Sequence, residues 1–314
     1  MGNFNKYKAE YLEHLVIKNF AEKTIANKER SLRYFIEFLA KVNITNVEEI
    51  FEKHLEEYKK ERHYYENAFK RQDCAHTQNK HLITIKDFFK YLKKNSKIAY
   101  NVAENLESIK ESKSLPQVVL CDKEIRTMID KIDTCTILGY RNRTMMEVLY
   151  TTGMRNSELR NLKDFEVNLE EGIIKITQGK GRKDRIVPIG KLAVEYLGNY
   201  MKFVRQEFLK RGKDRGKGKE YLFMTTNGNK MDVVDLVGIV KSIAKDGGIE
   251  KKVTPHVIRR TCATEMIRHK ANLMYVKELL GHESLESIKP YCRLNIMDLK
   301  EAHKRCHPRE QGVV

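Results

Sequence analysis

The chain has little of several features that mark common protein classes. Among its 314 residues are only five prolines and six cysteines, and no apolar run approaches the roughly 20 residues that span a bilayer. No signal peptide or lipidation motif is found at its polar, charged start. The cysteines are scattered without a CxxC pair, so neither a zinc site nor a disulfide framework is indicated. We therefore expect no membrane association, and a location in a reducing cytoplasm.

Acidic residues are also in deficit, and no carboxylate cluster suited to Mg²⁺ is evident, so we expect neither a metal nor a cofactor. Lysine and arginine number 60 against 43 aspartates and glutamates, which gives a formal net charge of +17. Such an excess destabilises a compact chain by self-repulsion, so a polyanionic partner is expected, and nucleic acid is the first candidate. The length favours two domains over a single core.

Residues 1–109 indicate helices with almost no strand signal. Apolar side chains recur at helical spacing, most clearly in the stripe of Leu82, Ile85, Phe88, Phe89 and Leu92. The polar side of that last helix carries Lys80, Lys86 and Lys90. Asn46, with Glu49 three residues later, predicts the N-terminal cap of an earlier helix. We interpret this part as a helical domain whose basic face follows a DNA backbone.

Residues 110–117 are polar, without apolar period, and are the predicted linker to a second domain at 118–294. A terminal helix and tail are expected at 295–314. Within the second domain, Asp122 is the expected N-cap of a helix, and another helix is expected to stop at Gly153.

The period then changes from helical to two. Strands are expected at 172–177 and 185–190, with Lys180 at the hairpin tip between two glycines. One long helix is predicted for 191–210, an edge strand and turn for 221–231, and a further helix ending at Gly247.

Charged and aromatic residues follow at fixed intervals near the end. His256 and Arg259 are three apart, so on a helix they share a face. His282 follows an apolar run at Gly281, a helix stop, and Tyr291 lies nine residues beyond it. Together these groups suggest a phosphate clamp beside a nucleophile, although each feature alone is common on ordinary helices.

Arg155 and Glu158 are also three residues apart and would share a helix face, where the carboxylate orients the guanidinium group. The alternative is an ordinary surface ion pair, which contributes only about 0.3–0.5 kcal/mol.

In chain order the second domain presents TGMRNSEL, GKGRKDRIVP, HVIRRT, LLGH and a tyrosine nine residues later. This set resembles the tyrosine recombinase (phage integrase) family, and its compact Xer and Cre-like members most. The resemblance covers nearly the whole chain. It implies a fold mainly of helices with a small antiparallel sheet, divided into a helical core-binding domain and an α+β catalytic domain.

The catalytic set that the resemblance implies is Arg155, Lys180, His256, Arg259, His282 and Tyr291, with Glu158 in support. In this set the arginines clamp the scissile phosphate, and the lysine protonates the leaving 5′-hydroxyl. The histidines hydrogen-bond the phosphate and assist proton transfer, and the tyrosine forms a 3′-phosphotyrosyl bond. A phenol, whose ordinary pKa is about 10, needs such cationic neighbours to ionise near neutral pH. Other basic residues expected to contact DNA are Arg182, Lys183 and Arg260.

The sequence also departs from the family's pattern. Arg260 stands where Xer-like members usually have histidine, and Val257 stands where aspartate is usual. Pro290 directly precedes Tyr291 and biases the residue before it away from helix, while Cys292 has no assignable role. None of these departures removes a catalytic group.

The leading hypothesis is a site-specific recombinase that acts on double-stranded DNA as a homo-tetramer on two sites, with a monomer in the absence of DNA. The departures, with no further N-terminal arm-binding domain of the lambda type expected, favour integration, excision or transposition of a mobile element. Alternatives are Xer-like resolution of chromosome or plasmid dimers, an inactive DNA-binding regulator on the same fold, and a topoisomerase-like enzyme. The family's terminal helix commonly docks on a neighbouring subunit, so the resemblance implies that role for 295–314; packing on its own domain is the alternative.

Overall fold

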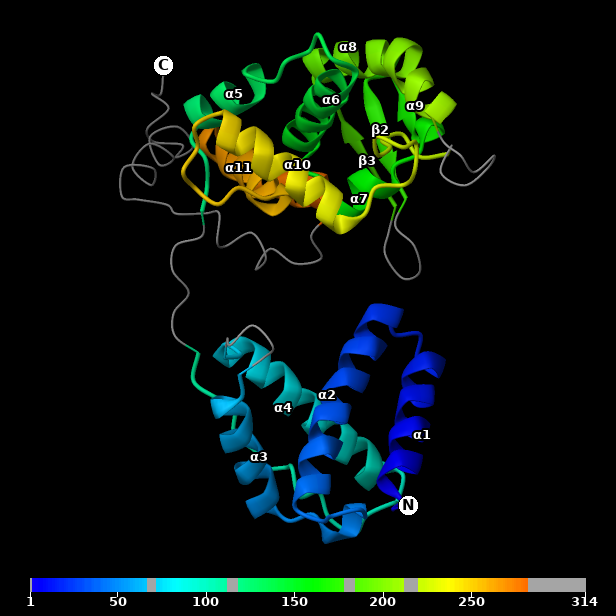
Figure 1. The fold of residues 1–314 in the computed structure, drawn as a ribbon, viewed down its shortest axis with the longest axis vertical. Coiled ribbons are helices and arrows are strands. Elements are labelled where there is room, and N and C mark those ends of the chain that lie inside the picture. The colour runs from blue at the N-terminus through cyan, green and yellow to red at the C-terminus, as the bar shows by residue number, and fades with distance from the viewer. Residues whose placement is uncertain (1, 67–71, 112–117, 178–183, 212–219, 282–314) are drawn as a thin grey trace, which may run out of the picture. The chain divides into compact units, whose positions relative to one another are not determined.

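The computed structural model describes residues 2–66, 72–111, 118–177, 184–211 and 220–281. The chain divides into two compact units, Met1–Pro116 and Gln117–Val314. Both are mainly helical, and the second contains a small antiparallel sheet (Figure 1). The expected fold class is confirmed.

The first unit is a bundle of helices around an aromatic core. Its long helices are α1 (Phe4–Ile17), α2 (Glu22–Lys41), α3 (Glu52–Tyr64) and α4 (Ala75–Lys94). Phe35 of α2 packs edge-on against Tyr58 of α3 and Phe89 of α4, with ring centroids 5.0 and 6.4 Å apart. Every member of the apolar stripe expected on α4 is buried, so the helical period correctly predicted which face packs.

The cap expected at Asn46 is present, but it begins a different element. The Glu49 side chain accepts hydrogen bonds from the backbone and side-chain amides of Asn46, and this pair begins a single 3₁₀ turn, η1 (Val47–Glu49). Helix α3 starts only at Glu52. The expectation that the cap belonged to the long helix was wrong, because a short turn with its own buried Val47 intervenes.

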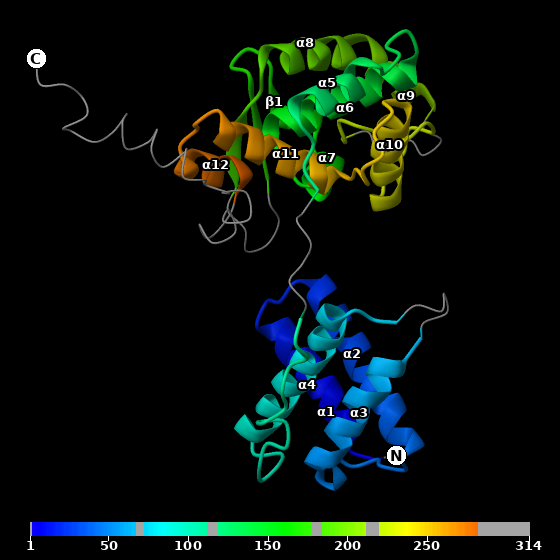
Figure 2. The same ribbon diagram turned by 90° about the vertical axis from the view of Figure 1, so that its left-hand side faces the viewer.

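The second unit is built around one central helix, with the following elements: α5 (Asp122–Asp130), α6 (Ile137–Thr152), α7 (Asn156–Asn161), η2 (Asp164–Glu166), β1 (Val167–Asn168), β2 (Ile173–Ile176), β3 (Arg185–Pro188), α8 (Lys191–Asn199), η3 (Tyr200–Val204), α9 (Arg205–Arg211), α10 (Val233–Asp246), α11 (Pro255–Arg268) and α12 (Leu273–Leu280). Helix α6 contacts both α8 and α11 and lies between them in Figures 1 and 2. The N-cap of α5 is Cys121 rather than the expected Asp122, which is the first helical residue.

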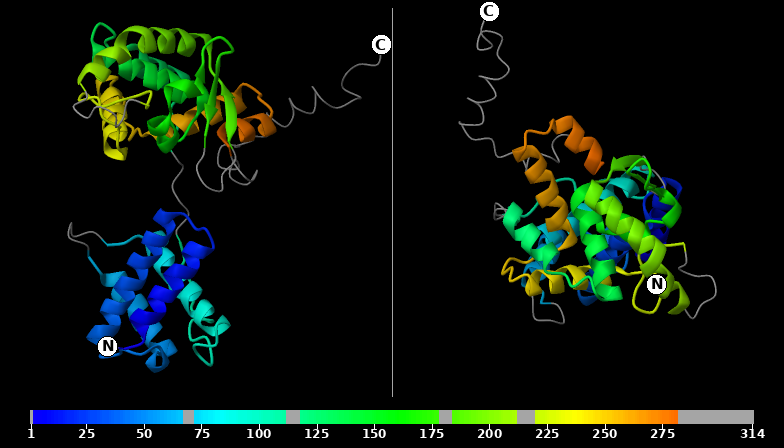
Figure 3. Two further views of the ribbon diagram at one scale, coloured as in Figure 1. Left: turned by 90° about the vertical axis from the view of Figure 1, so that its right-hand side faces the viewer. Right: turned by 90° about the horizontal axis from the view of Figure 1, so that it is seen from above.

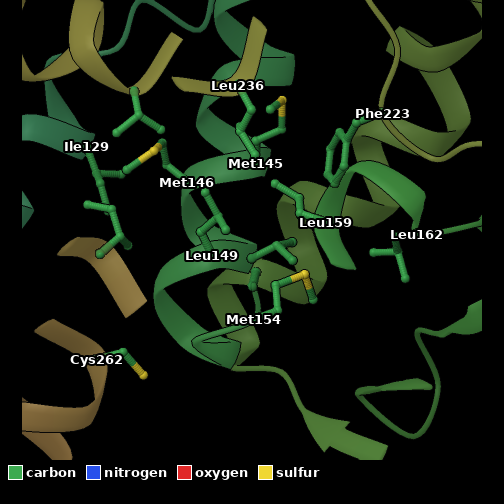
Figure 4. Close-up of a cluster of buried hydrophobic side chains, with 14 of the residues drawn as sticks. Ile129, Met145, Met146, Leu149, Met154, Leu159, Leu162, Phe223, Leu236 and Cys262 are labelled. Carbon is green, nitrogen blue, oxygen red and sulfur yellow. The ribbon is translucent and has the colours of Figure 1, made fainter. Parts of the chain in front are cut away.

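Burial explains why α6 is central. Residues Met145, Met146, Val148 and Leu149 are all at most 1% exposed, and a helix that is apolar on several faces must be covered on several sides. Figure 4 shows Met145, Met146 and Leu149 gathered with Leu159 of α7 and Leu236 of α10 in one cluster. The cluster fixes the end of α6, and with it the turn that leads to Arg155.

The sheet has the order β1-β2-β3 with antiparallel pairing. Ile174 pairs with Val187, and both are 0% exposed, so one face of the hairpin packs on the core. Strand β1 was not expected from the sequence. The edge strand expected at 221–231 was wrong: among the described residues this segment makes only isolated bridges, one from Tyr221 and one between Met224 and Lys230. Its apolar residues 222–224 are all buried, which contributes core contacts without a ladder.

The helix expected at 191–210 is interrupted. Residues Tyr200–Val204 form a π-helical turn between α8 and α9, a local widening that inserts one extra residue in a helical turn. It places Tyr200 in the core, where its hydroxyl donates to the Leu222 carbonyl at 2.9 Å. Across the described residues, no helix is both long and apolar enough to cross a membrane.

Gly153 generates a prediction about the stability of this unit. It caps the C-terminus of α6 in the left-handed conformation, with φ of +57°, and a Cβ there would lie 2.7 Å from a methyl carbon of Leu280 and 3.3 Å from Cys262 Sγ. We expect Gly153→Ala to combine a backbone cost of roughly 1–2 kcal/mol with about 1–3 kcal/mol of overpacking, seen as a lower Tm in calorimetry.

Gly248 provides the matched control. It also has positive φ, +75°, but no heavy atom lies within 4 Å of the position that a Cβ would occupy there. Gly248→Ala should therefore lower the Tm only by the backbone cost. Equal decreases in Tm for the two variants would show that Gly153 is required for its conformation alone and not for its contact with Leu280.

Candidate active site

The residues that the sequence nominated fall into two groups. Arg155, Glu158, His256 and Arg259 lie in described parts of the second unit. Residues outside the described parts are Lys180, Arg182, Lys183, His282 and Tyr291, and the expected terminal helix at 295–314 lies outside them too. The site geometry therefore comes from the first group and the residues that contact it.

Arg155 is the N-cap of α7, and Glu158 is the third residue of that helix. One carboxylate oxygen of Glu158 accepts from the Arg155 backbone N–H and the other from its guanidinium group, each at 2.7 Å. The two residues therefore interact as expected, but through a helix cap and not across a helix face. Because the Glu158 side chain is only 7% exposed, this is also not an ordinary surface ion pair.

A second arginine, which the sequence pattern did not single out, completes the environment of Glu158. Arg185 begins β3 and donates from both terminal nitrogens to the two carboxylate oxygens at 2.9 and 2.8 Å. Its Nε donates to the Leu279 carbonyl at 2.9 Å. In the sequence Arg185 is one more cation after a basic turn; only its position at the start of an otherwise apolar strand hinted at burial.

Helix α11 positions the HxxR motif. The Thr254 side chain accepts a hydrogen bond from the Val257 N–H, and Pro255 occupies the first turn, so the helix begins immediately before His256. His256 is exposed, whereas Arg259 is 5% exposed. Arg259 donates to the Gly153 carbonyl at 2.7 Å and to the Leu280 carbonyl at 2.8 Å. It therefore joins the end of α6 to the end of α12.

Three arginines meet at the C-terminus of α12, where the last carbonyls of a helix lack helical partners and carry partial negative charge. Arg185 donates to Leu279 O, Arg259 to Leu280 O and, at 2.8 Å, Arg155 to Gly281 O. Helix α12 contacts β3, and the left view of Figure 3 shows it beside the strands. Gly281 has φ of +62° and ends the helix as expected; His282 is the next residue.

Burial, hydrogen bonds and nearby charges together shift two pKa values at this site. Burial opposes ionisation of Glu158, but hydrogen bonds from Arg185 and Arg155 and the charge of Arg185 outweigh it and lower the pKa to about 2. Partial desolvation, and then the charges of Arg259, Arg260 and Arg155, lower the pKa of His256. At neutral pH the carboxylate is therefore ionised and the imidazole is neutral. Guanidinium groups and a neutral imidazole together suit the binding of a phosphate.

The residues expected to contact DNA differ in exposure. Lys80 and Lys90 of α4 are exposed, whereas Lys86 is half-buried and donates to the Leu106 carbonyl at 2.9 Å. Arg260 is also half-buried and donates to the Val118 carbonyl at 3.0 Å. Two of these four cations therefore already donate hydrogen bonds to backbone carbonyls of the same chain. In the described part of the chain, no group of three or more His, Cys, Asp or Glu residues is placed to hold a metal ion.

The buried Glu158 leads to a prediction on pH and stability. Its pKa is lower in the folded chain, about 2, than the ordinary 4.5, so its stabilising contribution is complete above pH 4.5 and is lost as pH falls toward 2. The difference corresponds to on the order of 3 kcal/mol. The free energy of unfolding in urea should therefore differ most between Glu158→Gln and the wild type near pH 6. This difference should become smaller toward about pH 3.

The exposed pair between Glu207 and Lys210 provides the control for this measurement. Glu207→Gln should show no resolvable pH-dependent gap, because solvent screens exposed pairs. If the difference in unfolding free energy between Glu158→Gln and the wild type stays constant with pH, the loss comes from packing. The ionisation of Glu158 would then not be its cause.

Comparison with known proteins gives the relationship of the chain. The sequence profile described as "Phage integrase family" matches residues 119–297, and that described as "Phage integrase, N-terminal SAM-like domain" matches residues 9–96. Tyrosine recombinase XerD of Listeria monocytogenes serotype 4b is 32% identical over 304 residues, covering 96% of this chain and 98% of the relative.

Solved structures are similar over the same extent. The crystal structure of XerA recombinase is 27% identical with a TM-score of 0.52, covering 97% of this chain and 99% of that one. The Tn1549 transposon integrase, solved in complex with a circular intermediate DNA, has a TM-score of 0.75 over 96% of this chain and 99% of that one; at 17% identity the likeness is one of fold. From the profile match over more than half of the chain and the full-length relationship to XerD, we conclude that this protein belongs to the phage integrase family of tyrosine recombinases.

Proposed function

We propose that this enzyme cleaves and rejoins specific DNA sites through a covalent bond to Tyr291. The observation that supports the proposal is the convergence of Arg155 and Arg259 on the end of α12, immediately before His282. One arginine is the N-cap of α7 and the other lies in α11, yet both donate to that one helix terminus. Two planar, permanently charged groups held together suit the negative charge that develops on a scissile phosphate.

In the proposed step, the phenol oxygen of Tyr291 forms a bond to phosphorus while the bond from phosphorus to the 5′ oxygen breaks. The 5′ oxygen takes a proton from Lys180 and leaves as a hydroxyl. The phenol proton passes to an imidazole, for which the lowered pKa of His256 favours the neutral, accepting form. The 3′-phosphotyrosyl product retains a phosphate ester, so attack by a 5′-hydroxyl rejoins a strand without ATP.

The remaining residues of the site have supporting roles. Glu158 would hold Arg155 in orientation, His282 would hydrogen-bond the phosphate, and the basic residues Lys80, Lys86, Lys90, Arg182, Lys183 and Arg260 would follow the DNA backbone. The net charge of +17 and the DNA in the Tn1549 integrase complex support double-stranded DNA as the partner.

Strand exchange between two DNA sites requires more than one active site, so we propose a homo-tetramer on two sites, formed from monomers when DNA binds. Residues 295–314 would dock on a neighbouring subunit. The division proposed for the chain remains a core-binding domain at 1–109, a linker at 110–117 and a catalytic domain at 118–294.

Two biological roles have support. Arg260, in place of the usual Xer histidine, favours integration, excision or transposition of a mobile element. The 32% identity to a XerD over nearly the whole chain favours resolution of chromosome or plasmid dimers. The two roles differ in where the bound sites lie: at the ends of an element, or at one place in the chromosome or plasmid. Sequencing of DNA retained by the protein distinguishes them.

The nucleophile is tested with a nicked suicide duplex, which traps the covalent intermediate. We expect an SDS-resistant adduct with the wild type and none with Tyr291→Phe. Tyr275 of α12, 48% exposed, is the matched control, and Tyr275→Phe should retain the adduct. An adduct with Tyr291→Phe would reject the assignment, whereas a wild type that binds DNA without any adduct would support a regulator that has lost catalysis.

The role of Lys180 is tested by replacing the bridging 5′ oxygen with sulfur, a leaving group that needs little protonation. Cleavage by Lys180→Ala should fall by about 10²–10⁴ on the oxygen substrate, the usual size of a general-acid contribution, and should largely recover on the sulfur substrate. Cleavage by Arg155→Ala should not recover on the sulfur substrate, because this variant loses a group that binds the phosphate.

Lys175, exposed on β2 of the same hairpin, provides the control. Lys175→Ala should cleave both substrates at the wild-type rate. Similar recovery of Lys180→Ala and Arg155→Ala on the sulfur substrate would make Lys180 a phosphate ligand and not a proton donor.

A further inference from the structure

Arg185 is the residue of the arginine cluster that has no role in the proposed chemistry. Its side chain is 9% exposed, and each of its three guanidinium nitrogens donates to an acceptor within the protein. Two of these bonds go to Glu158 and one goes to the Leu279 carbonyl. A buried guanidinium group with this set of internal acceptors is built into the domain, unlike the exposed lysines of α4.

The acceptors of Arg185 lie on the two sides of the site. Glu158 holds the backbone and the guanidinium group of Arg155, whereas Leu279 O belongs to the last turn of α12. Arg185 thus connects the residue that orients one phosphate-binding arginine to the helix end that precedes His282. Arg155 completes this set of hydrogen bonds, because it also donates to the end of α12, at Gly281 O.

Gly281 shows how closely Arg185 sets the end of α12. A Cβ at Gly281 would lie 3.0–3.2 Å from the side chain of Arg185, so the guanidinium group packs directly against the glycine backbone. The left-handed conformation of Gly281 and this close approach disfavour a larger side chain at the point where the chain leaves the helix.

We propose that Arg185 is a positioning residue for strand cleavage. It holds Arg155, through Glu158, and the end of α12 in one geometry. The phosphate-binding arginines are thereby placed correctly for attack by Tyr291. The inference rests on the proposed function. It requires the guanidinium fork, because a single ammonium group at Arg185 cannot reach Leu279 O and both oxygens of Glu158 at once.

The test compares Arg185→Lys with the wild type in three measurements. These are the free energy of unfolding in urea, the Kd for an intact duplex site, and the single-turnover cleavage rate on oxygen and sulfur suicide substrates. Lysine keeps the charge opposite Glu158, so we expect folding and a Kd within about threefold of the wild type. Cleavage should fall by about 10²-fold, the effect of a misplacement of about 1 Å, and should not recover on sulfur, because leaving-group protonation is intact.

Arg141 supplies a matched control. It is also buried, at 4% exposure, and donates to a backbone carbonyl, that of Met224 at 2.7 Å. Its hydrogen-bond partners, Met224 and the neighbouring Asn142, both lie outside α12. Arg141→Met should lower stability while its folded fraction cleaves at the wild-type rate. If Arg185→Met is compared with it at matched folded fractions, only the Arg185 variant should be slow.

Several outcomes would overturn the proposal. Wild-type cleavage by Arg185→Lys, or a loss explained wholly by its unfolded fraction, would make the residue merely structural. A rise in Kd as large as the fall in cleavage would make it a DNA contact. In each of these cases the wild type still forms its adduct and the proposed function stands; absence of the wild-type adduct would reject both proposals together.

Discussion

A buried carboxylate held between two guanidinium groups is the interaction on which the candidate site depends. Taken alone, an ionised Glu158 at 7% exposure would be strongly unfavourable in the interior. Arg155 and Arg185 compensate for it with four hydrogen bonds, counting one from backbone. The same bonds that make the buried charge tolerable also orient Arg155. The local stability and the orientation of Arg155 therefore depend on one set of contacts.

The second constraint is the end of α12. Its final carbonyls carry the negative end of the helix dipole, and three cations are gathered on them without a carboxylate being needed at each one. Because these acceptors are only partially charged, they hold the arginines with less neutralisation of positive charge than carboxylates would. The site thereby concentrates positive charge beside the chain that continues to His282. In the proposed site, the terminus of α12 would support anion binding because its carbonyls hold three arginines in place.

Local signals in the sequence predicted the helix ends at glycines, whereas the assignment of the Asn46 cap to a long helix and the uninterrupted helix at 191–210 were wrong. The ends of α6 and α12 followed from Gly153 and Gly281, since left-handed caps favour glycine. The pairing of Arg155 with Glu158 followed from their spacing. The burial of Glu158 did not, because Arg185, which covers it, lies 27 positions later in the sequence. The apolar run at 222–224 has strand composition, yet it lacks a partner strand in the described fold. A pattern indicates which faces are apolar; only the folded neighbours decide what covers them.

The long sequence separations within the arginine cluster have a consequence for folding. Arg155 and its acceptor Gly281 are 126 residues apart, Arg185 and Leu279 are 94 apart, and Arg259 and Gly153 are 106 apart. Contacts of such high order require closure of the long loops between them, which carries an entropic cost and slows folding. The positive charge, by contrast, exists from synthesis onward. A nascent chain can therefore adhere to nucleic acid before its clamp is assembled, and the ability to break a strand arises only when the whole domain has folded.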